Sequence, residues 1–238
     1  MTGAIAWNGR PVGCVLFDLD GTLIETAGDI ALALNRALAE HGIESLPVDV
    51  VRTLIGRGAP RLVSRAVAMR GLEPSAELCD AIFEQFLDHY ARLHDEGESS
   101  AVAFPGVVAA LGALTARGVP LAVVTNKQHR LAVQALHHAG IEKAFGVIVG
   151  GDTCAKRKPD PQPLLHACQA LGVPADRALM IGDSVIDVTA ARAASIPVLC
   201  VPYGYNEGND PRALPCDGFI DTIGLLPGLL LGTRPGPM

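Results

Sequence analysis

The spacing of apolar residues divides the chain into a helical block and a block in which strands and helices alternate. In the first block apolar residues recur every three to four positions, as in the segment 26–41, where Ile30, Leu34 and Leu38 share one face and Gly42 follows. This spacing, with a glycine at its end, predicts an amphipathic helix. The same pattern returns in the segments 58–70 and 75–93. The first block is therefore predicted to be helical throughout.

Short apolar runs in the second block predict buried strands. One run precedes the helical block and four follow it, at 13–17, 120–124, 146–149, 178–181 and 197–201. Helices are expected between them, at 106–117, 128–139, 161–171 and 185–194. Apolar strands separated by helices favour a parallel sheet covered on both faces. The predicted fold is therefore α/β: a Rossmann-like parallel sheet core, residues 1–23 and 100–238, with an inserted all-helical cap domain, residues 24–99.

Composition and charge narrow the possible partners. The chain has 19 Lys and Arg against 25 Asp and Glu, a formal charge of −6, and no basic run that could neutralise a row of phosphates. Nucleic-acid binding is therefore not expected. No segment reaches the roughly 18 apolar residues of a membrane span, and the N-terminus lacks the pattern of a secretory signal. The six cysteines form no CxxC pair, so we expect reduced thiols in a cytoplasmic protein without membrane contact.

Polar side chains follow four of the predicted strands. In chain order they are Asp18 and Asp20, Thr125 and Asn126, Lys158, and Asp183 and Asp187. In open parallel sheets the ligand lies beyond the carboxyl ends of the strands, so these side chains are expected to meet. An anionic nucleophile, an acid or base, donors to phosphate oxygens and carboxylates for a hard divalent cation together suit phosphoryl transfer. The set predicts a phosphoryl-transfer site for a small-molecule phosphate ester.

Charge explains why such a site needs both a cation and a lysine. A carboxylate that approaches a phosphate is repelled, because two unit charges about 4 Å apart cost roughly 4 kcal/mol at an effective dielectric of about 20. Mg²⁺ and Lys158 can offset that repulsion. Asp18 and Asp20 are two positions apart beyond an extended segment, so they can project to the same side and take two distinct roles.

These strings resemble, over essentially the whole chain, the four-motif signature of the haloacid dehalogenase superfamily: Asp-Leu-Asp-Gly-Thr-Leu from residue 18, Thr125 after a strand, Lys-Pro-Asp-Pro from residue 158, and Gly-Asp-Ser-Val-Ile-Asp from residue 182. The resemblance implies that Asp18 forms an aspartyl-phosphate, while Asp20 protonates the leaving alkoxide and then activates water. It also implies that the Asp18 carboxylate, the Asp20 backbone carbonyl and Asp183 bind Mg²⁺, with Asp187 as an outer or water-mediated ligand. A structural alternative for Asp187 is capping of a helix N-terminus.

The same resemblance assigns the phosphate contacts. Thr125 and the backbone at Asn126 would hold phosphate oxygens, and Lys158 would bind both the phosphate and the nucleophile. Three short loops look like those of phosphoglycolate phosphatases: Gly-Arg-Gly-Ala-Pro from residue 56, Lys-Pro-Asp-Pro from residue 158, and Tyr-Gly-Tyr-Asn from residue 203. Within the first of them Arg57 is a candidate substrate contact, and the alternative is an exposed loop arginine.

The expected function is Mg²⁺-dependent hydrolysis of a small organic phosphate, such as phosphoglycolate. Three alternatives stay open: a phosphatase of a sugar-like or nucleoside-like phosphate in a specialised pathway, a phosphomutase similar to the β-phosphoglucomutases, and a catalytically silent binding protein. A dehalogenase is disfavoured because Asp20 would have no evident task there. The oligomeric state is expected to be monomer or homodimer.

Overall fold

The computed structural model describes residues 5–231, and a six-stranded sheet lies at its centre. All five pairings between neighbouring strands are parallel, and the strand order is β10-β9-β8-β3-β6-β7. The strands are β3 (Cys14–Phe17), β6 (Leu121–Val124), β7 (Val147–Val149), β8 (Ala178–Gly182), β9 (Val198–Cys200) and β10 (Gly218–Phe219). Five of these strands were predicted from the sequence. β10 was not, because two half-buried residues at a sheet edge give no apolar run.

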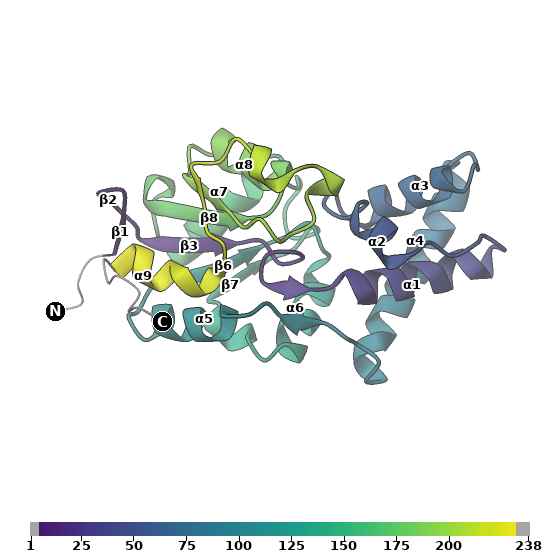
Figure 1. The fold of residues 1–238 in the computed structure, drawn as a ribbon, viewed down its shortest axis with the longest axis horizontal. Coiled ribbons are helices and arrows are strands. Elements are labelled where there is room, and N and C mark those ends of the chain that lie inside the picture. The colour runs from purple at the N-terminus through teal and green to yellow at the C-terminus, as the bar shows by residue number, and fades with distance from the viewer. Residues whose placement is uncertain (1–4, 232–238) are drawn as a thin grey trace.

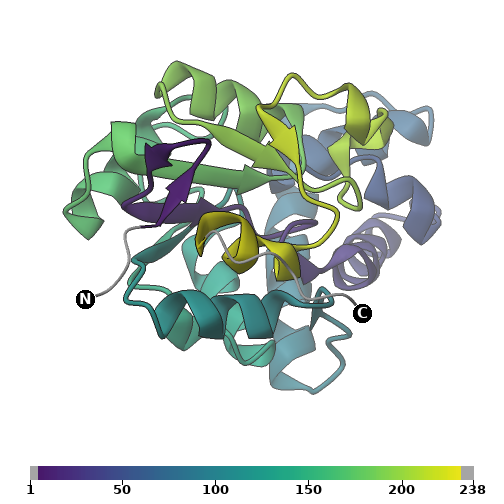
Figure 2. The same cartoon turned by 60° about the vertical axis from the view of Figure 1, so that its left-hand side comes forward.

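Helices cover both faces of the sheet, so the predicted α/β fold is confirmed (Figures 1 and 2). Side chains of β3 alternate between the faces: Val15 and Phe17 belong to one apolar core, and Cys14 and Leu16 to the other. The first core includes side chains of α5 (Val107–Thr115), α6 (His129–His138) and α9 (Leu226–Leu231). The second includes side chains of α7 (Gln162–Leu171) and α8 (Val185–Ala193).

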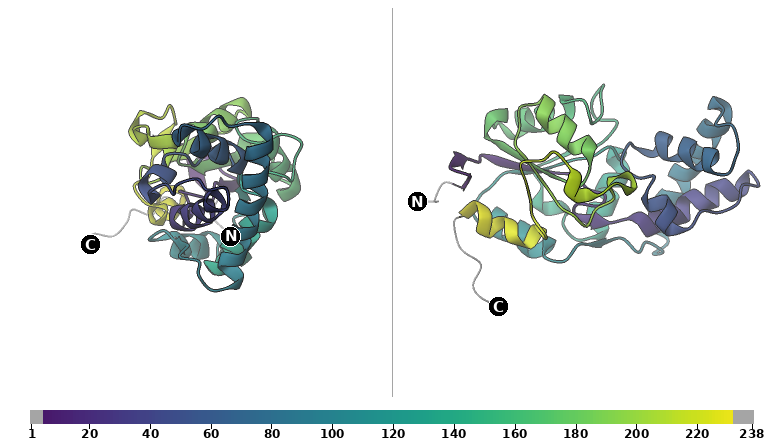
Figure 3. Two further views of the ribbon diagram at one scale, coloured as in Figure 1. Left: turned by 90° about the vertical axis from the view of Figure 1, so that its right-hand side faces the viewer. Right: turned by 45° about the horizontal axis from the view of Figure 1, so that its top comes forward.

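The helical block forms a third core at one end of the sheet. Its helices are α1 (Ala27–Glu40), α2 (Val48–Arg52), α3 (Ala59–Met69) and α4 (Ala76–Asp95), and we call this region, residues 27–95, the helical unit. It lies beyond the carboxyl end of β3, at the opposite end of the molecule from α9 (Figures 1 and 3). Only α2 was not predicted, because five residues are too short to show helical periodicity.

Two chain segments connect the helical unit to the sheet, and they pair with each other. β4 (Ile24–Glu25) leads into the unit and β5 (Val102–Ala103) leads out, as an antiparallel ribbon. The segment predicted to be entirely helical, 24–99, therefore begins with a two-residue strand. The first four and last seven residues of the predicted core lie outside the described residues.

Shorter elements complete the fold. β1 (Ala6–Trp7) and β2 (Arg10–Pro11) form a hairpin around Asn8 and Gly9, which both have positive φ, as a tight turn requires. The short 3₁₀ helices are Glu142–Ala144, Ala175–Arg177, Asn206–Gly208, Pro211–Ala213 and Ile223–Leu225. Among residues 5–231 no helix has the length and apolarity needed to cross a bilayer.

Helix α5 allows a matched test of the first core. Leu111 is 1% exposed and Val108, on the same helix, is 59% exposed. Leu111→Ala is expected to lower the free energy of unfolding by about 2–5 kcal/mol, because it removes buried apolar surface and leaves a cavity. Val108→Ala is expected to change it by less than about 0.5 kcal/mol. Urea denaturation followed by circular dichroism measures both, and equal losses would contradict this assignment of the buried face.

Candidate active site

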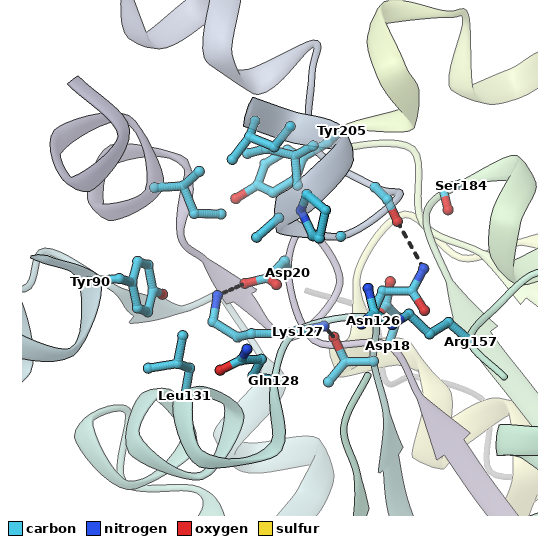
Figure 4. Close-up of a pocket in the computed structure, with 18 of the residues that line it drawn as sticks. Asp18, Asp20, Tyr90, Asn126, Lys127, Gln128, Leu131, Arg157, Ser184 and Tyr205 are labelled. Carbon is cyan, nitrogen blue, oxygen red and sulfur yellow. Dashed lines mark hydrogen bonds and ion pairs between the residues drawn. The ribbon is translucent and has the colours of Figure 1, made fainter. Parts of the chain in front are cut away.

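A pocket lies between the carboxyl ends of the central strands and the helical unit (Figure 4). β3 has β8 on one side and β6 on the other, so the loops that follow these three strands meet there. The sheet side contributes Asp18, Asp20, Thr125 and Asp183 to the lining, and α4 contributes Tyr90 among other residues. This is the position in which open parallel sheets bind ligands.

Asp18 directly follows β3, and its carboxylate is held from two sides. Its Oδ1 accepts a hydrogen bond from the backbone N–H of Leu19 (2.7 Å) and lies 2.9 Å from Nζ of Lys158. Burial, with a further contribution from the negative charge of Asp187, raises the pKa of Asp18 well above its ordinary value, although Lys158 opposes the shift. The pKa is raised because the site holds too little positive charge to offset burial and the neighbouring carboxylates.

Lys158 is the cation of this cluster. Its side chain is buried, and its Nζ lies 2.6 Å from Oδ1 of Asp187 as well as 2.9 Å from Asp18. Burial alone would lower the pKa of this ammonium, but the two carboxylates outweigh burial and raise the pKa above its ordinary value. Lys158 is therefore the positively charged partner of both carboxylates.

Asp183 follows β8 and is oriented by two donors. The Thr22 hydroxyl donates to its Oδ1 (2.8 Å), and the backbone N–H of Tyr205 donates to its Oδ2 (2.7 Å). Gly21, at φ +82°, makes room for this carboxylate, because a Cβ there would lie 2.5 Å from Oδ2. Burial, followed by the charge of Asp187, raises the pKa of Asp183 to about 7. Asp183 thus lies at the predicted strand end, where the Thr22 hydroxyl and the Tyr205 backbone hold its carboxylate in place.

Asp187 caps a helix, which is the structural alternative that the sequence left open, and it also contacts Lys158. It is fully buried at the first turn of α8, where its Oδ2 accepts from the backbone N–H (3.1 Å) and the hydroxyl (2.7 Å) of Ser184. These contacts form a capping box at the helix N-terminus. Its Oδ1 meanwhile contacts Lys158. One carboxylate therefore both caps α8 and joins the charged cluster.

The cluster fits a divalent cation. Carboxylate oxygens of Asp18, Asp183 and Asp187 lie within 4.8 Å of one another. When all three carboxyls are ionised, the single ammonium of Lys158 leaves two negative charges without a partner in the cluster, and one Mg²⁺ ion would balance them. Carboxylate oxygens are also the ligands that Mg²⁺ prefers. The Asp20 side chain lies outside this group, so its predicted contribution through the backbone carbonyl stays a prediction.

Asp20 faces a different set of partners. Its Oδ1 accepts from the Thr26 hydroxyl (2.7 Å) and from Nζ of Lys127 (2.9 Å), and its side chain is 14% exposed within the pocket. Asp18 and Asp20, predicted to take different roles, thus have separate cations. Lys158 serves the first carboxylate and Lys127 the second.

Thr125 and Asn126 follow β6, as predicted, and line the pocket. Thr125 is 3% exposed, and its hydroxyl accepts a hydrogen bond from the backbone N–H of Lys127 (3.2 Å). The Asn126 amide donates to the backbone carbonyls of Gly56 (3.2 Å) and Lys158 (3.0 Å). Asn126 therefore connects the helical unit to the phosphate-binding loop predicted at Lys158.

Arg57 is the one predicted residue that the structure does not bring together with the others. Its Nε lies 3.0 Å from both carboxylate oxygens of Glu207, its side chain is 48% exposed, and it is not among the residues that line the pocket. Its neighbours Gly56 and Gly58 do line the pocket. Substrate contact by Arg57 stays a prediction.

Sequence reasoning missed Lys127 and Tyr90. Lys127 directly follows Asn126, so its place after a strand was an available signal. Tyr90 gave no such signal, because it lies on the apolar face of α4 and belongs to the core of the helical unit. In the structure Nζ of Lys127 lies 4.3 Å from the centroid of the Tyr90 ring.

A parallel sheet with acidic side chains gathered at the ends of its central strands is the arrangement expected of a haloacid dehalogenase-like hydrolase. The haloacid dehalogenase-like hydrolase family matches residues 15–201, and the chain belongs to it. A protein of Cupriavidus necator named "Phosphoglycolate phosphatase, plasmid" is 45% identical over 227 residues, which are 95% of this chain and 96% of that one. The phosphoglycolate phosphatase of Thiobacillus denitrificans is 42% identical, over 90% of this chain and 93% of its own.

Solved structures agree with this family. A predicted phosphoglycolate phosphatase from Haemophilus somnus superposes with a TM-score of 0.82 at 30% identity, over 90% of this chain and 96% of that one. A variant of CbbY from Rhodobacter sphaeroides, in complex with xylulose-(1,5)bisphosphate, superposes with a TM-score of 0.74 at 25% identity, over 90% and 95% of the two chains. The protein is therefore an enzyme of the phosphatase class.

The raised pKa of Asp183 predicts how stability depends on pH and metal. The folded protein binds a proton at this carboxylate with a pKa of about 7, against an ordinary value of 3.8, so the free energy of unfolding falls as pH rises between these values. A bound cation would remove this penalty. Mg²⁺ is therefore expected to raise the Tm more at about pH 8 than at about pH 5.

Differential scanning fluorimetry with and without Mg²⁺ measures this difference. Asp183→Asn is expected to lose most of the Mg²⁺-dependent shift at the higher pH. The control, Asp80→Asn, removes an exposed carboxylate of α4 and is expected to keep the shift. Equal Mg²⁺ shifts at the two pH values would contradict the link between this cluster and the metal.

Proposed function

We propose that the protein is a Mg²⁺-dependent phosphomonoesterase that hydrolyses a small organic phosphate, phosphoglycolate or a close analogue, through an aspartyl-phosphate at Asp18. The observation that carries this proposal is the cluster of Asp18, Asp183 and Asp187 around Lys158, beside a second carboxylate, Asp20, with its own partners. The names of the curated relatives support the choice of substrate.

In the first step the Asp18 carboxylate attacks phosphorus and the bond from phosphorus to the leaving oxygen breaks. Asp20 gives its proton to that oxygen, so the alcohol leaves neutral. In the second step Asp20 takes a proton from water, the water oxygen bonds to phosphorus, and the bond to Asp18 breaks. Phosphate is released and both carboxylates return to their starting forms.

The other residues of the site hold the phosphoryl group against charge repulsion. Lys158 contacts Asp18 directly and offsets part of the repulsion between that carboxylate and the phosphate. Asp18, Asp183 and the Asp20 carbonyl would hold Mg²⁺, with Asp187 behind them, and the ion would supply the remaining positive charge. Thr125 and the backbone at Asn126 are assigned to phosphate oxygens.

The pocket lining supports a compact leaving group over a sugar. The helical unit and α6 line it with apolar side chains, Ile30, Ile55, Phe83, Phe86, Leu87 and Leu131. The hydroxyls of a sugar that faced this apolar wall would lose hydrogen bonds to water, which costs free energy. A short organic acid needs only one polar partner beyond the phosphate.

The helical unit is proposed to act as a cap domain over this site, because it covers the carboxyl ends of β3 and β6 and contributes one wall of the pocket. A cytoplasmic location is proposed as well, and the six free thiols support it, since such a compartment keeps cysteines reduced.

A chromogenic substrate tests the two carboxylates separately. Nitrophenolate leaves without being protonated, so Asp20→Asn is expected to complete the first step with p-nitrophenyl phosphate and then stall. The result is a burst of about one nitrophenolate per active site, followed by turnover reduced roughly 10²–10⁴-fold. Asp18→Asn is expected to show neither burst nor turnover. Stopped-flow absorbance measures the burst, with Asp80→Asn as the control.

The intermediate is identified in the same samples. Acid quench of the Asp20→Asn reaction followed by peptide mass spectrometry is expected to find phosphate on the peptide that contains Asp18. Phosphate on another residue, or full turnover by Asp18→Asn, would overturn the proposed nucleophile.

A further inference from the structure

The pocket contains a positive charge that the proposed mechanism does not use. The Lys127 side chain is only 7% exposed, and its Nζ lies 2.9 Å from Oδ1 of Asp20 and 4.3 Å from the centroid of the Tyr90 ring. Burial alone would lower the pKa of this ammonium, but Asp20 and Tyr90 outweigh burial and raise it. By these distances the ammonium lies inside the pocket between Asp20 and the ring of Tyr90 (Figure 4).

Tyr90 adds a polar group that lacks a partner. Its side chain is fully buried and lines the pocket, yet its hydroxyl has no hydrogen bond within the described part of the chain. In Figure 4 the hydroxyl points toward Lys127. A buried hydroxyl without a partner costs free energy, and such groups are rare unless a ligand or water satisfies them. The donor is therefore available to a bound molecule.

The surroundings of this pair favour an anion. Ile30, Phe86 and Leu131 also line the pocket and offer no hydrogen bond, and the Phe86 ring centroid lies 5.9 Å from that of Tyr90. A charged ligand group would therefore find two donors, one ammonium and one hydroxyl, among largely apolar side chains and the Gln128 amide (Figure 4). In such an environment a charge-assisted hydrogen bond is stronger than in water.

We infer that Lys127 and Tyr90 form a subsite for a carboxylate on the alcohol half of the substrate. The inference rests on the proposed function, since it places the phosphoryl group at Asp18 and the leaving oxygen at Asp20. A single methylene separates that oxygen from the carboxylate in phosphoglycolate, and Lys127 already contacts the Asp20 side chain. The substrate carboxylate then replaces Asp20 as the partner of the ammonium and accepts a hydrogen bond from Tyr90.

This subsite selects substrates by their leaving group, while residues at the ends of the sheet strands bind the phosphoryl group. A neutral leaving group of the same length gives Lys127 no new partner and leaves the Tyr90 hydroxyl buried and unpaired. Arg157 is the competing cation, because it also lines the pocket, but its side chain is exposed and its Nε donates to the Gly151 carbonyl.

Two substrates of equal length, 2-phosphoglycolate and ethyl phosphate, test the inference. Their kcat/KM ratio is expected to fall about thirtyfold or more in Lys127→Met, because one charged contact acts on only one of the two substrates. Tyr90→Phe removes only the hydroxyl, and the ratio is expected to fall about tenfold. Because that hydroxyl has no partner in the free protein, the Tm of Tyr90→Phe is expected not to decrease.

Two control variants separate this subsite from general charge effects. Lys143→Met removes an exposed lysine of the 3₁₀ helix Glu142–Ala144, and Arg157→Gln removes the competing cation. Both are expected to keep the wild-type ratio. A ratio that collapses in Arg157→Gln and not in Lys127→Met would overturn the assignment, as would an unchanged ratio in Lys127→Met.

A binding measurement distinguishes failure of the subsite from failure of the proposed function. Titration calorimetry on Asp18→Asn, with and without Lys127→Met, gives the dissociation constants of both esters without turnover. If the wild type hydrolyses neither ester, the proposed function fails and these constants still decide the subsite. If the wild type hydrolyses both and Lys127→Met binds them with the wild-type preference, only the subsite is wrong.

Discussion

Excess negative charge at the ends of the central strands is the constraint on which the rest of the site depends. Asp18, Asp183 and Asp187 are brought within 4.8 Å with one ammonium between them. At such separations like charges repel by several kcal/mol even with partial screening, for example about 4 kcal/mol at 4 Å and an effective dielectric of about 20. The fold tolerates this because backbone donors, a helix N-terminus and Lys158 stabilise the carboxylates. The negative charge that they do not compensate gives the site its affinity for positive charge.

Two cations divide the site into two functions. Lys158 is confined to the interior, where it neutralises the carboxylates that would bind metal and attack phosphorus. Lys127 follows a neighbouring strand, only one residue beyond Asn126, yet its ammonium contacts Asp20 and faces the ring of Tyr90 on α4. The sheet can therefore treat the phosphoryl group identically in every substrate. The walls that the helical unit contributes are apolar except for one tyrosine, so they offer few polar contacts to the rest of the substrate.

The sequence predicted most of the sheet and most of the site for the same physical reason. Buried parallel strands appear as continuous apolar runs, and the polar residues that follow them must converge at one edge, so Asp18, Asp183 and Lys158 were found where expected. Elements of two residues, such as β4, β5 and β10, leave no periodic signal. They exist because tertiary contacts, and not local preference, complete their hydrogen bonds.

Side chains that act across the boundary between the sheet and the helical unit were the ones that pattern alone could not place. In the sequence Tyr90 is one more apolar position on α4, because its proposed role in the subsite and its burial in the core involve the same face of the helix. Arg57 was predicted to contact substrate, and its loop sequence does not reveal that Glu207, 150 residues later, lies beside it. Both cases depend on how the helical unit is oriented relative to the sheet, and the spacing of residues along the sequence does not specify that orientation.

Tyr205 shows how that orientation is tied to the charge at the strand ends. Its backbone N–H donates to Asp183 (2.7 Å), while its hydroxyl accepts from the backbone N–H of Thr26 (2.8 Å) and donates to Glu25 (2.7 Å). One residue thus holds a carboxylate of the cluster at one end and the start of α1 at the other. Because Glu25 belongs to the ribbon that joins the two parts of the chain, the helical unit cannot move at this joint without changing contacts that also position Asp183. The geometry of the cluster and the orientation of the helices above it are therefore set by a common set of hydrogen bonds.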